Sequence, residues 1–339
     1  MTKLRTLVIG FGKVASGMVA DAKMARYFDY ASHASVLNTH PEFDWLGVVD
    51  PNPAAQEDAR SKWRVVHVGA DVSEIANMVR PEVVVLATPP GHRAKIVAKL
   101  PTVKAILVEK PLNAPSDDDG SALAEICAAR GIKVLVNYWR RADRLFQSLS
   151  AGGLQQKIGD VQTVFGLYGN GLSNNGSHMI DFLRLLAGDI VGVQALSSPT
   201  SASASSVAGD VSLSFALTLK SGAVASFSPV EFETYREVGL DIWGTRGRLS
   251  ILQEGLTTRL FSCCENRGLT DAREIDSDQG TILECTVGDS LYRMYDNLAA
   301  VARGVGDPWS SLHSALVTET IMSRILQSAE QGGARLPLD

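Results

Sequence analysis

His178 and Asp181, near the middle of the chain, have the residue types and spacing of an acid–base pair. They open an apolar stretch, 179–186, that predicts a helix, and a spacing of three residues puts both side chains on one face. Asn and Ser residues precede the stretch and signal a helix start, so we expect His178 in the first turn, at the positive end of the helix. That position favours a neutral imidazole, which can accept a proton. Taken alone, such a pair is more often a cap and a surface contact than a catalytic base.

Lys110 is a second candidate for chemistry, in the sequence Glu109-Lys110-Pro111 that follows a short apolar run. The proline limits Lys110 to extended or turn conformations. If the run is a strand of a parallel sheet, the lysine lies at the carboxyl end of that strand, where such sheets bind ligands. The alternative interpretation is a solvated loop lysine.

Short aliphatic runs recur through residues 1–137, with helical segments between them. The runs are apolar throughout, which is typical of strands that are covered on both faces in a parallel sheet. Their alternation with helices predicts a doubly wound Rossmann domain. The expected strands are 6–9, 45–49, 65–68, 83–87, 105–108 and 133–136, and the expected helices include 14–27, 54–63, 93–100 and 117–130.

A G-x-G-x-x-A motif at residues 10–15 follows the first expected strand. The first glycine permits a tight turn, the second lets the backbone approach a pyrophosphate, and the small third residue lets helix and strand pack closely. N–H groups at the start of the next helix would bind the phosphates. The alternative is a glycine turn without a ligand. The cofactor-binding residues expected here are Gly10, Phe11, Gly12, Lys13 and Val14.

Asp50 ends the second expected strand and is placed to accept hydrogen bonds from the adenosine ribose. Its charge would repel a 2′-phosphate and no arginine follows at once, which favours NAD over NADP. Gly10 and Asp50 are 40 positions apart, about twice the usual ~20. The excess, around 30–41, predicts an inserted loop or short helix that either reaches the active site or is inert surface.

The later expected strands end where the nicotinamide half of a dinucleotide would lie. Polar residues and prolines follow these strand ends, and a lysine among them is the candidate described above. The cofactor-binding residues expected on this side are Thr88, Pro89, His92, Glu109, Lys110 and Asn137.

The sequence pattern changes after residue 137. Residues 211–219 alternate large apolar with small or polar side chains, and 223–230, 238–243, 249–252 and 256–261 also predict strands. Short links at 220–222 and 244–247 predict hairpins, so we expect a large, open, predominantly antiparallel sheet and a closing helix over 311–331. We therefore expect two domains, a dinucleotide-binding domain (1–137) and an α+β substrate-binding and oligomerisation domain (138–339).

Composition excludes several classes of protein. The 339 residues carry a net charge of −5, which gives no electrostatic case for binding nucleic acid or an anionic membrane. The four cysteines have no zinc-site spacing, so we expect no metal, and their usage is typical of the reducing cytoplasm. No stretch approaches the ~20 apolar residues of a membrane helix.

Together these motifs resemble the glucose–fructose oxidoreductase, inositol dehydrogenase and rhizopine catabolism family, Gfo/Idh/MocA. The resemblance covers nearly the whole chain and depends on the glycine turn, Glu109-Lys110-Pro111, the 137–141 segment, the 244–247 hairpin, and Gly176-Ser177-His178 with Asp181. It implies a Rossmann domain and a second domain with an open sheet, through which members often form homodimers or homotetramers. It also implies oxidation or reduction of a hydroxyl on a sugar, cyclitol or nucleotide sugar.

The resemblance assigns the catalytic lysine to Lys110 and the catalytic histidine to His178. The aspartate that the family places four residues before this histidine corresponds here to Asn174, a departure, since a neutral amide cannot stabilise an imidazolium as a carboxylate does. Asp181 would compensate, although in the family it is more often structural. The segment 168–171 also resembles members found with surface-polysaccharide biosynthesis.

We therefore expect an NAD-dependent sugar oxidoreductase in which His178 takes the hydroxyl proton and Lys110 steadies the substrate oxygen. Three alternatives remain: an NAD- or sugar-binding sensor without turnover, an NAD-dependent glycosidase with no net redox change, and a structural or scaffolding protein.

Overall fold

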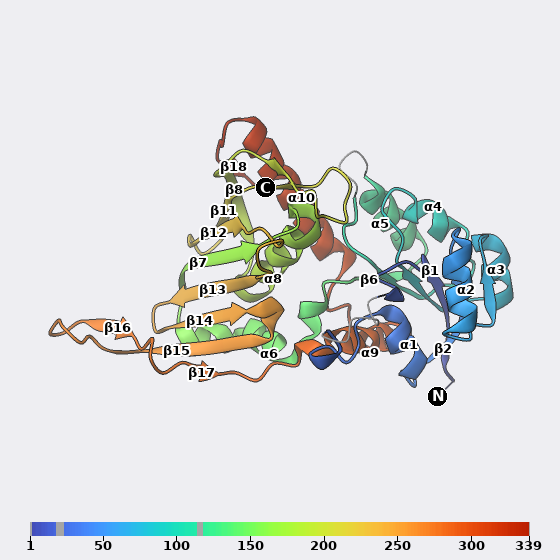
Figure 1. The fold of residues 1–339 in the computed structure, drawn as a ribbon, viewed down its shortest axis with the longest axis horizontal. Helices are drawn as coiled ribbons and strands as arrows, with labels where there is room; N and C mark the ends of the chain where they lie inside the picture. Colours follow the sequence, from blue (N-terminus) through green and yellow to red (C-terminus); the bar gives the residue numbers. More distant parts are fainter. Residues whose placement is uncertain (1, 18–23, 114–117, 339) are drawn as a thin grey trace. The chain divides into compact units, whose positions relative to one another are not determined.

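The computed structural model describes residues 2–17, 24–113 and 118–338 of the chain (Figure 1). The chain divides into two compact units. The first combines Met1–Ala142 with Gly288–Leu316, and the second combines Asp143–Val287 with Val317–Asp339. The sequence analysis placed one boundary after 137 and assigned every later residue to the second domain. In the structure, residues 138–142 and 288–316 instead pack with the first unit.

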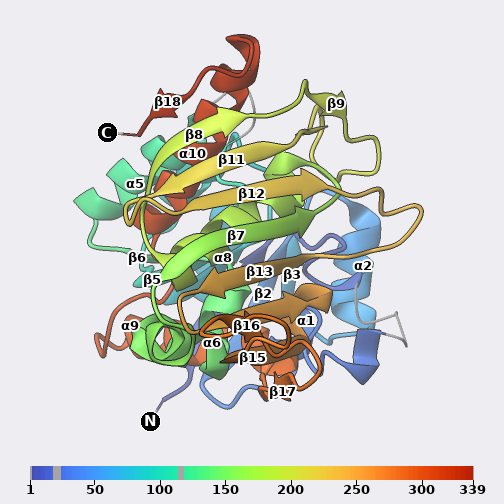
Figure 2. The same ribbon diagram turned by 90° about the vertical axis from the view of Figure 1, so that its left-hand side faces the viewer.

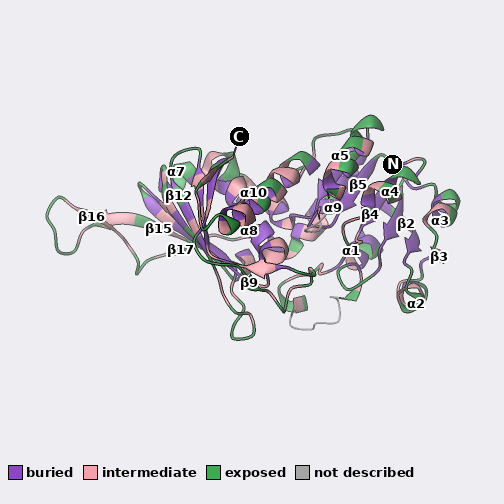
Figure 3. Cartoon of the chain, turned by 90° about the horizontal axis from the view of Figure 1, so that it is seen from above, coloured by how far each residue is buried: buried purple, intermediate pink, exposed green. Residues whose placement is uncertain are grey.

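Six parallel strands form the sheet of the first unit, in the order β3-β2-β1-β4-β5-β6. This is the strand order of a doubly wound dinucleotide-binding sheet, and it confirms the fold predicted for this half of the chain. Strands β4 and β5 are buried throughout, as their uninterrupted apolar sequences indicate (Figure 3). The strands are β1 (Leu4–Ile9), β2 (Phe43–Val49), β3 (His67–Gly69), β4 (Val83–Leu86), β5 (Ala105–Val108) and β6 (Lys133–Val136).

Helices cover both faces of this sheet, because successive side chains of each strand point to opposite sides. Val8 of β1 packs in the core that holds α1 and α9, whereas Leu7 and Ile9 pack in the core that holds α3, α4 and α5. The helices are α1 (His33–Thr39), α2 (Pro53–Ser61), α3 (Val72–Val79), α4 (Arg93–Ala98), α5 (Asp119–Ala129) and α9 (Ser290–Ala302).

The helix expected over 14–27 is not found among the described residues of that segment, and 18–23 lie outside them. Residues 12–17 form hydrogen-bonded turns, and Met24–Arg26 form a short 3-10 helix, η2. Gly17 disfavours a helix interior by about 1 kcal/mol, whereas Ser32 and Ser35 form a capping box that starts α1. The prediction of an inserted loop or short helix around 30–41 is confirmed by α1.

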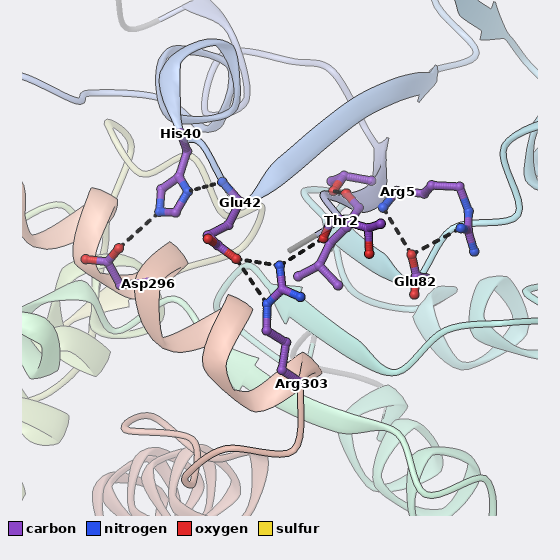
Figure 4. Close-up of polar contacts among 9 residues, drawn as sticks. Thr2, Arg5, His40, Glu42, Glu82, Asp296 and Arg303 are labelled. Atoms are coloured by element: carbon purple, nitrogen blue, oxygen red, sulfur yellow. Dashed lines mark hydrogen bonds and ion pairs between the residues drawn. The ribbon is translucent and has the colours of Figure 1, made fainter.

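Polar contacts tie α9 to the base of the first unit (Figure 4). Arg303, directly after α9, donates from Nε to Glu42 Oε2 at 3.0 Å and from Nη2 to the Thr2 carbonyl at 3.1 Å. Two turns earlier along α9, Asp296 Oδ1 lies 3.1 Å from His40 Nε2. These contacts join the end of α1 and the start of β2 to residues 256 and 261 positions later in the chain.

The second unit contains a ten-stranded sheet (Figure 2) in the order β16-β15-β14-β13-β7-β12-β11-β8-β18, with β17 also paired to β15. Only β7 and β12 run parallel; the other pairs are antiparallel, as the sequence predicts. The strands are β7 (Val161–Tyr168), β8 (Ile190–Ala195), β11 (Phe215–Leu219), β12 (Val224–Pro229), β13 (Gly239–Gly244), β14 (Gly247–Leu252), β15 (Thr257–Glu265), β16 (Arg273–Ile275), β17 (Thr281–Ile282) and β18 (Leu336–Pro337).

One face of this sheet is covered by helix α8 (Ser177–Ala187), which packs on β7 and β13. Strand β11 shows the resulting alternation, because Phe215, Leu217 and Leu219 are buried while Ala216 and Thr218 are partly exposed. A separate pair, β9 (Thr200–Ser201) and β10 (Val211–Ser212), interrupts the strand expected over 211–219. The closing helix is α10 (Leu312–Glu330), close to its predicted bounds. Across the described ranges, we find no helix long and apolar enough to span a bilayer.

The burial of His40 predicts that the protein loses stability in acid. Burial lowers the pKa of His40 and outweighs Asp296, which raises it, so the pKa in the folded protein lies below its ordinary value. In the unfolded chain the same side chain protonates near ~6.5. The unfolded state therefore binds more protons as the pH falls through that range, and the folded state loses stability. We expect the free energy of unfolding in urea to fall between pH 7.5 and 5.5, and to fall less in His40→Gln. Equal pH slopes for the two proteins would contradict the prediction.

Candidate active site

The glycine turn after β1 shows why its two glycines differ. Gly10 has a φ of +86°, and a Cβ on it would lie 2.8 Å from the carbonyl carbon of Ala87, so this position requires glycine. A Cβ on Gly12 would meet no described atom within 4 Å. Ala15 is fully buried in the core beside α1. Gly10 is therefore required by the close packing of the turn, whereas Gly12 leaves space for a ligand to contact the backbone.

Asp50 holds this turn against the end of β2. Its Oδ2 accepts a hydrogen bond from the Phe11 amide at 2.6 Å, and its Oδ1 accepts one from the Asn52 amide at 2.7 Å. A carboxylate offers about four lone-pair positions, so these two bonds leave acceptor capacity for ribose hydroxyls. The side chain is thus both a part of the turn and a candidate ligand contact.

The expected residues after β4 fall in different environments. His92 is exposed at the start of α4 and makes no side-chain cap, and Pro89 is exposed as well. Arg93, by contrast, is 1% exposed. It donates to the Thr88 carbonyl at 2.5 Å and to the Pro111 carbonyl at 2.8 Å, which joins the loops after β4 and β5. No role was predicted for Arg93, because an arginine at the first position of a helix gives no sequence signal of burial.

Two buried polar atoms at the strand ends lack a hydrogen-bond partner in the described part of the chain. They are Thr88 Oγ1, after β4, and Asn137 Oδ1, after β6. A buried polar group without a partner costs about 1–3 kcal/mol, so the two atoms fit a ligand that carries polar groups. With the open side of Gly12 and the carboxylate of Asp50, the residues present fit a bound dinucleotide.

Glu109 lies buried beside Lys110, which is half-buried. Its Oε1 accepts hydrogen bonds from His33 Nε2 at 2.9 Å and from Asn137 Nδ2 at 2.7 Å. Burial raises the pKa of Glu109, but the contacts with His33 and Asn137 and the charge of Lys110 together bring the pKa below its ordinary value. Glu109 is therefore a buried carboxylate. His33 comes from the segment around 30–41, whose role the sequence left open between the active site and the surface.

In the second unit, the helix that carries His178 begins earlier than expected. A π-helical turn, η5 (Leu172–Gly176), runs directly into α8, and no Asn or Ser side chain caps α8. His178 is the second residue of α8 and so lies in its first turn, as expected, but η5 adds helical residues before this turn. Its side chain is half-buried, whereas Asp181 is 2% exposed, which favours a structural role for Asp181. Asn174 precedes His178 by four positions and is partly exposed.

The start of this helix is held instead by Asp210, which the sequence analysis did not single out. Asp210 Oδ1 accepts from the Ser173 amide at 2.9 Å, and Oδ2 accepts from the Asn174 amide at 3.0 Å and from Ser205 Oγ at 2.8 Å. Gly171, with a φ of +91°, makes room for this carboxylate, because a Cβ there would lie 2.0 Å from Asp210 Oδ2. An anion at a helix start is favourable, so Asp210 fixes the turn that carries Asn174.

The structure groups the expected site residues by unit. All twelve cofactor candidates, including Lys110, belong to the first unit, and Asn174, His178 and Asp181 follow one another on η5 and α8 in the second.

Comparisons with known proteins agree with this architecture. The model of an oxidoreductase family with an NAD-binding Rossmann fold, GFO_IDH_MocA, matches residues 4–138, and the model of the GFO/IDH/MocA C-terminal domain matches residues 156–250. No curated protein sequence matches the chain.

Solved structures resemble the chain over its full length. The WlbA dehydrogenase from Bordetella pertussis, in complex with NADH and UDP-GlcNAcA, is 20% identical, covers 100% of this chain and 99% of its own, and has a TM-score of 0.73. A levoglucosan dehydrogenase in complex with NADH is 18% identical, covers 100% of both chains and has a TM-score of 0.75. A putative myo-inositol dehydrogenase from Sinorhizobium meliloti is 18% identical, covers 99% and 100%, and has a TM-score of 0.72. At these identities the likeness is one of fold.

Proposed function

Because the chain belongs to the GFO/IDH/MocA family of NAD-binding oxidoreductases, we propose that it is a dehydrogenase acting on a sugar-type substrate. It transfers hydride between NAD and a hydroxyl-bearing carbon of a sugar, cyclitol or nucleotide sugar. The observation that carries this proposal is the Rossmann glycine turn, open at Gly12 and closed by Asp50, in the same unit as Lys110 and the neighbouring buried Glu109.

The substrate class is supported by the proteins of similar fold. Their names include a levoglucosan dehydrogenase, a putative myo-inositol dehydrogenase and a WlbA dehydrogenase solved with a nucleotide sugar. Within that class we favour a nucleotide sugar used in surface-polysaccharide biosynthesis, because residues 168–171 resemble members with that role. Gly171 of this segment admits the Asp210 carboxylate that positions Asn174.

When bound, NAD supplies the hydride acceptor or donor. The amides of Gly10 and Phe11 already donate to Val49 and Asp50, so the backbone N–H groups of residues 12–14 are those that bind the pyrophosphate, and Asp50 accepts from the ribose hydroxyls. Asp50 also disfavours the 2′-phosphate of NADP by charge. Thr88, Pro89, His92, Glu109 and Asn137 are the proposed neighbours of the nicotinamide half, with Thr88 Oγ1 and Asn137 Oδ1 as the hydrogen-bonding atoms.

On the substrate, His178 acts as the general base and takes the hydroxyl proton as the hydride leaves the same carbon. General base catalysis of this kind contributes roughly 10²–10⁴ in rate. Lys110 donates to the substrate oxygen and stabilises its developing negative charge. Asn174 orients the substrate through its amide, and a neutral amide stabilises an imidazolium less than a carboxylate does.

The open face of the ten-stranded sheet is the surface we propose for self-association. Phe165 of β7 is 54% exposed on this sheet, and the neighbouring strands β11 and β12 present the small residues Ala216 and Ser226 opposite one another. An exposed aromatic side chain among small ones suits a second copy of the chain. We expect light scattering to give the mass of a dimer or tetramer in solution, whereas a monomer mass would contradict this proposal.

The two glycines predict opposite effects on stability and on coenzyme binding. Gly12→Ala should leave the melting temperature nearly unchanged, because its Cβ meets no described atom, and should weaken NADH binding by tenfold or more, because the methyl group enters the place of the pyrophosphate. Gly10→Ala should instead destabilise the fold by more than about 1 kcal/mol, since alanine is incompatible with its positive φ and with Ala87.

Both variants are measured by thermal unfolding and by NADH fluorescence titration. Unchanged NADH affinity in a well-folded Gly12→Ala protein would contradict coenzyme binding at this turn.

Turnover is tested with NAD or NADP and a panel of sugars, cyclitols and nucleotide sugars, followed by the absorbance of NADH. We expect NADH formation with at least one member of the panel and a preference for NAD over NADP. His178→Ala and Lys110→Ala should each lower kcat by roughly 10²–10⁴, with an unchanged Kd for NADH in His178→Ala.

The other outcomes identify the alternatives. Net hydrolysis of a glycoside without NADH accumulation would indicate an NAD-dependent glycosidase. Tight binding of NADH with no turnover on any substrate would indicate a sensor. Equal losses of turnover and NADH affinity in His178→Ala would contradict its role as the base.

A further inference from the structure

A chain of buried polar groups connects α9 and α1 to the loop that carries Lys110. The Tyr295 hydroxyl lies 2.9 Å from His33 Nδ1, and His33 Nε2 lies 2.9 Å from Glu109 Oε1. His33 is 1% exposed and Tyr295 is fully buried. All of these residues belong to the first unit. The chain therefore runs through the core, from a helix near residue 295 to the residue next to the proposed catalytic lysine.

The hydrogen positions in this chain follow from the chemistry of its members. Glu109 is a carboxylate and can only accept, so His33 donates to it from Nε2, and a ring that donates there can accept at Nδ1. Burial and the charge of Glu109 raise the pKa of Tyr295 well above its ordinary value, so its hydroxyl keeps its proton and donates to Nδ1. Tyr295 thus selects the tautomer of His33 that can bind Glu109.

A buried carboxylate requires such donors. Removing it from water without compensation costs several kcal/mol, and the group would otherwise take up a proton. His33 and Asn137 donate to the same oxygen, Oε1, and so fix both the charge and the orientation of the Glu109 side chain. The neighbouring Lys110 ammonium is favoured by this negative charge.

We propose that His33, held in one tautomer by Tyr295, is a positioning residue that keeps Glu109 ionised and thereby keeps Lys110 cationic and in place. This inference rests on the proposed function for the catalytic role of Lys110. The link between His33 and the lysine amine is a separate physical claim and can be measured without substrate.

The test is competitive acylation of the full-length protein with trace acetic anhydride from pH 7 to 11, read by peptide mass spectrometry. Only the unprotonated amine reacts, so the profile of Lys110 reports its protonation. Lys104, which pairs with Glu82 on the same unit, is the internal reference. If Glu109 loses its negative charge, the pH of half-maximal acylation of Lys110 moves down. If the variant only makes Lys110 more accessible, the maximal acylation rate at high pH rises and the midpoint stays in place.

We expect the His33→Leu midpoint to move down, with Lys110 reacting about three- to tenfold faster at pH 8, since one pKa unit corresponds to a tenfold change in free amine. Glu109→Gln should move it in the same direction, and His33→Leu should add little in the Glu109→Gln background. His33→Gln, whose Nε2 can still donate to Glu109, should restore most of the wild-type profile. Tyr295→Phe should give a smaller shift in the same direction.

His40→Leu is the matched control, because it removes a buried histidine at the end of the same helix that bonds Asp296 rather than Glu109. Its Lys110 midpoint should equal that of the wild type. An unchanged Lys110 midpoint in folded His33→Leu would overturn the inference. If that variant does not fold, an unchanged Lys110 midpoint in Tyr295→Phe would overturn it. Neither result affects the test of the dehydrogenase by NADH formation. Equally, a failure to form NADH would not contradict a measured shift of the Lys110 midpoint.

Discussion

The close approach of Gly10 to the backbone of Ala87 is the contact on which the first unit depends. The Gly10 amide donates to the Val49 carbonyl at 2.8 Å, and the Ala87 amide donates to the Ile9 carbonyl at 2.9 Å. The ends of β1, β2 and β4 are thereby drawn together at the point where the strand order reverses. In a doubly wound sheet this point is where ligands bind, so one residue without a side chain determines where Asp50, Thr88 and the Glu109 loop can meet a ligand.

Three buried carboxylates accept hydrogen bonds from backbone or side-chain donors that would otherwise bind water. Asp50 accepts from the amide of Phe11, Asp210 accepts from the amides that start the His178 helix, and Glu109 accepts from His33. Each is buried and each accepts at least two hydrogen bonds, the condition under which a buried charge is tolerated. In each case the charged group that fixes a loop lies beside a residue proposed to bind or react.

The sequence predicted well the strands and turns that depend on short-range residue patterns. Uninterrupted aliphatic runs located all six strands of the first sheet to within a few residues, and the glycine motif located the turn after β1. The start of η5 was harder to predict, because its backbone amides donate to a residue that is distant in the sequence. The acceptor at the η5 start, Asp210, lies 36 positions from Asn174, and no local pattern joins the two.

The same reason explains why His33, Tyr295 and Arg93 were not recognised as parts of the site. His33 and Tyr295 are 262 positions apart, and the contact between them exists only because α9 returns to the first unit after every strand of the large sheet except β18. Strands β7 and β8 were also missed, since a single half-buried strand gives a weak signal until its neighbours are known. Proline, glycine and aliphatic runs act locally, whereas buried polar partners are set by tertiary structure.

One backbone contact has a consequence for how this family can vary in length. The Ala34 amide donates to the Ala15 carbonyl at 2.9 Å, so the two ends of the 16–33 segment are joined at its base. The entropy of closing such a loop grows only logarithmically, by about 0.6 kcal/mol for each doubling of its length. Lengthening the segment therefore costs little in loop-closure entropy, and the Ala34–Ala15 contact can keep His33 in place against Glu109.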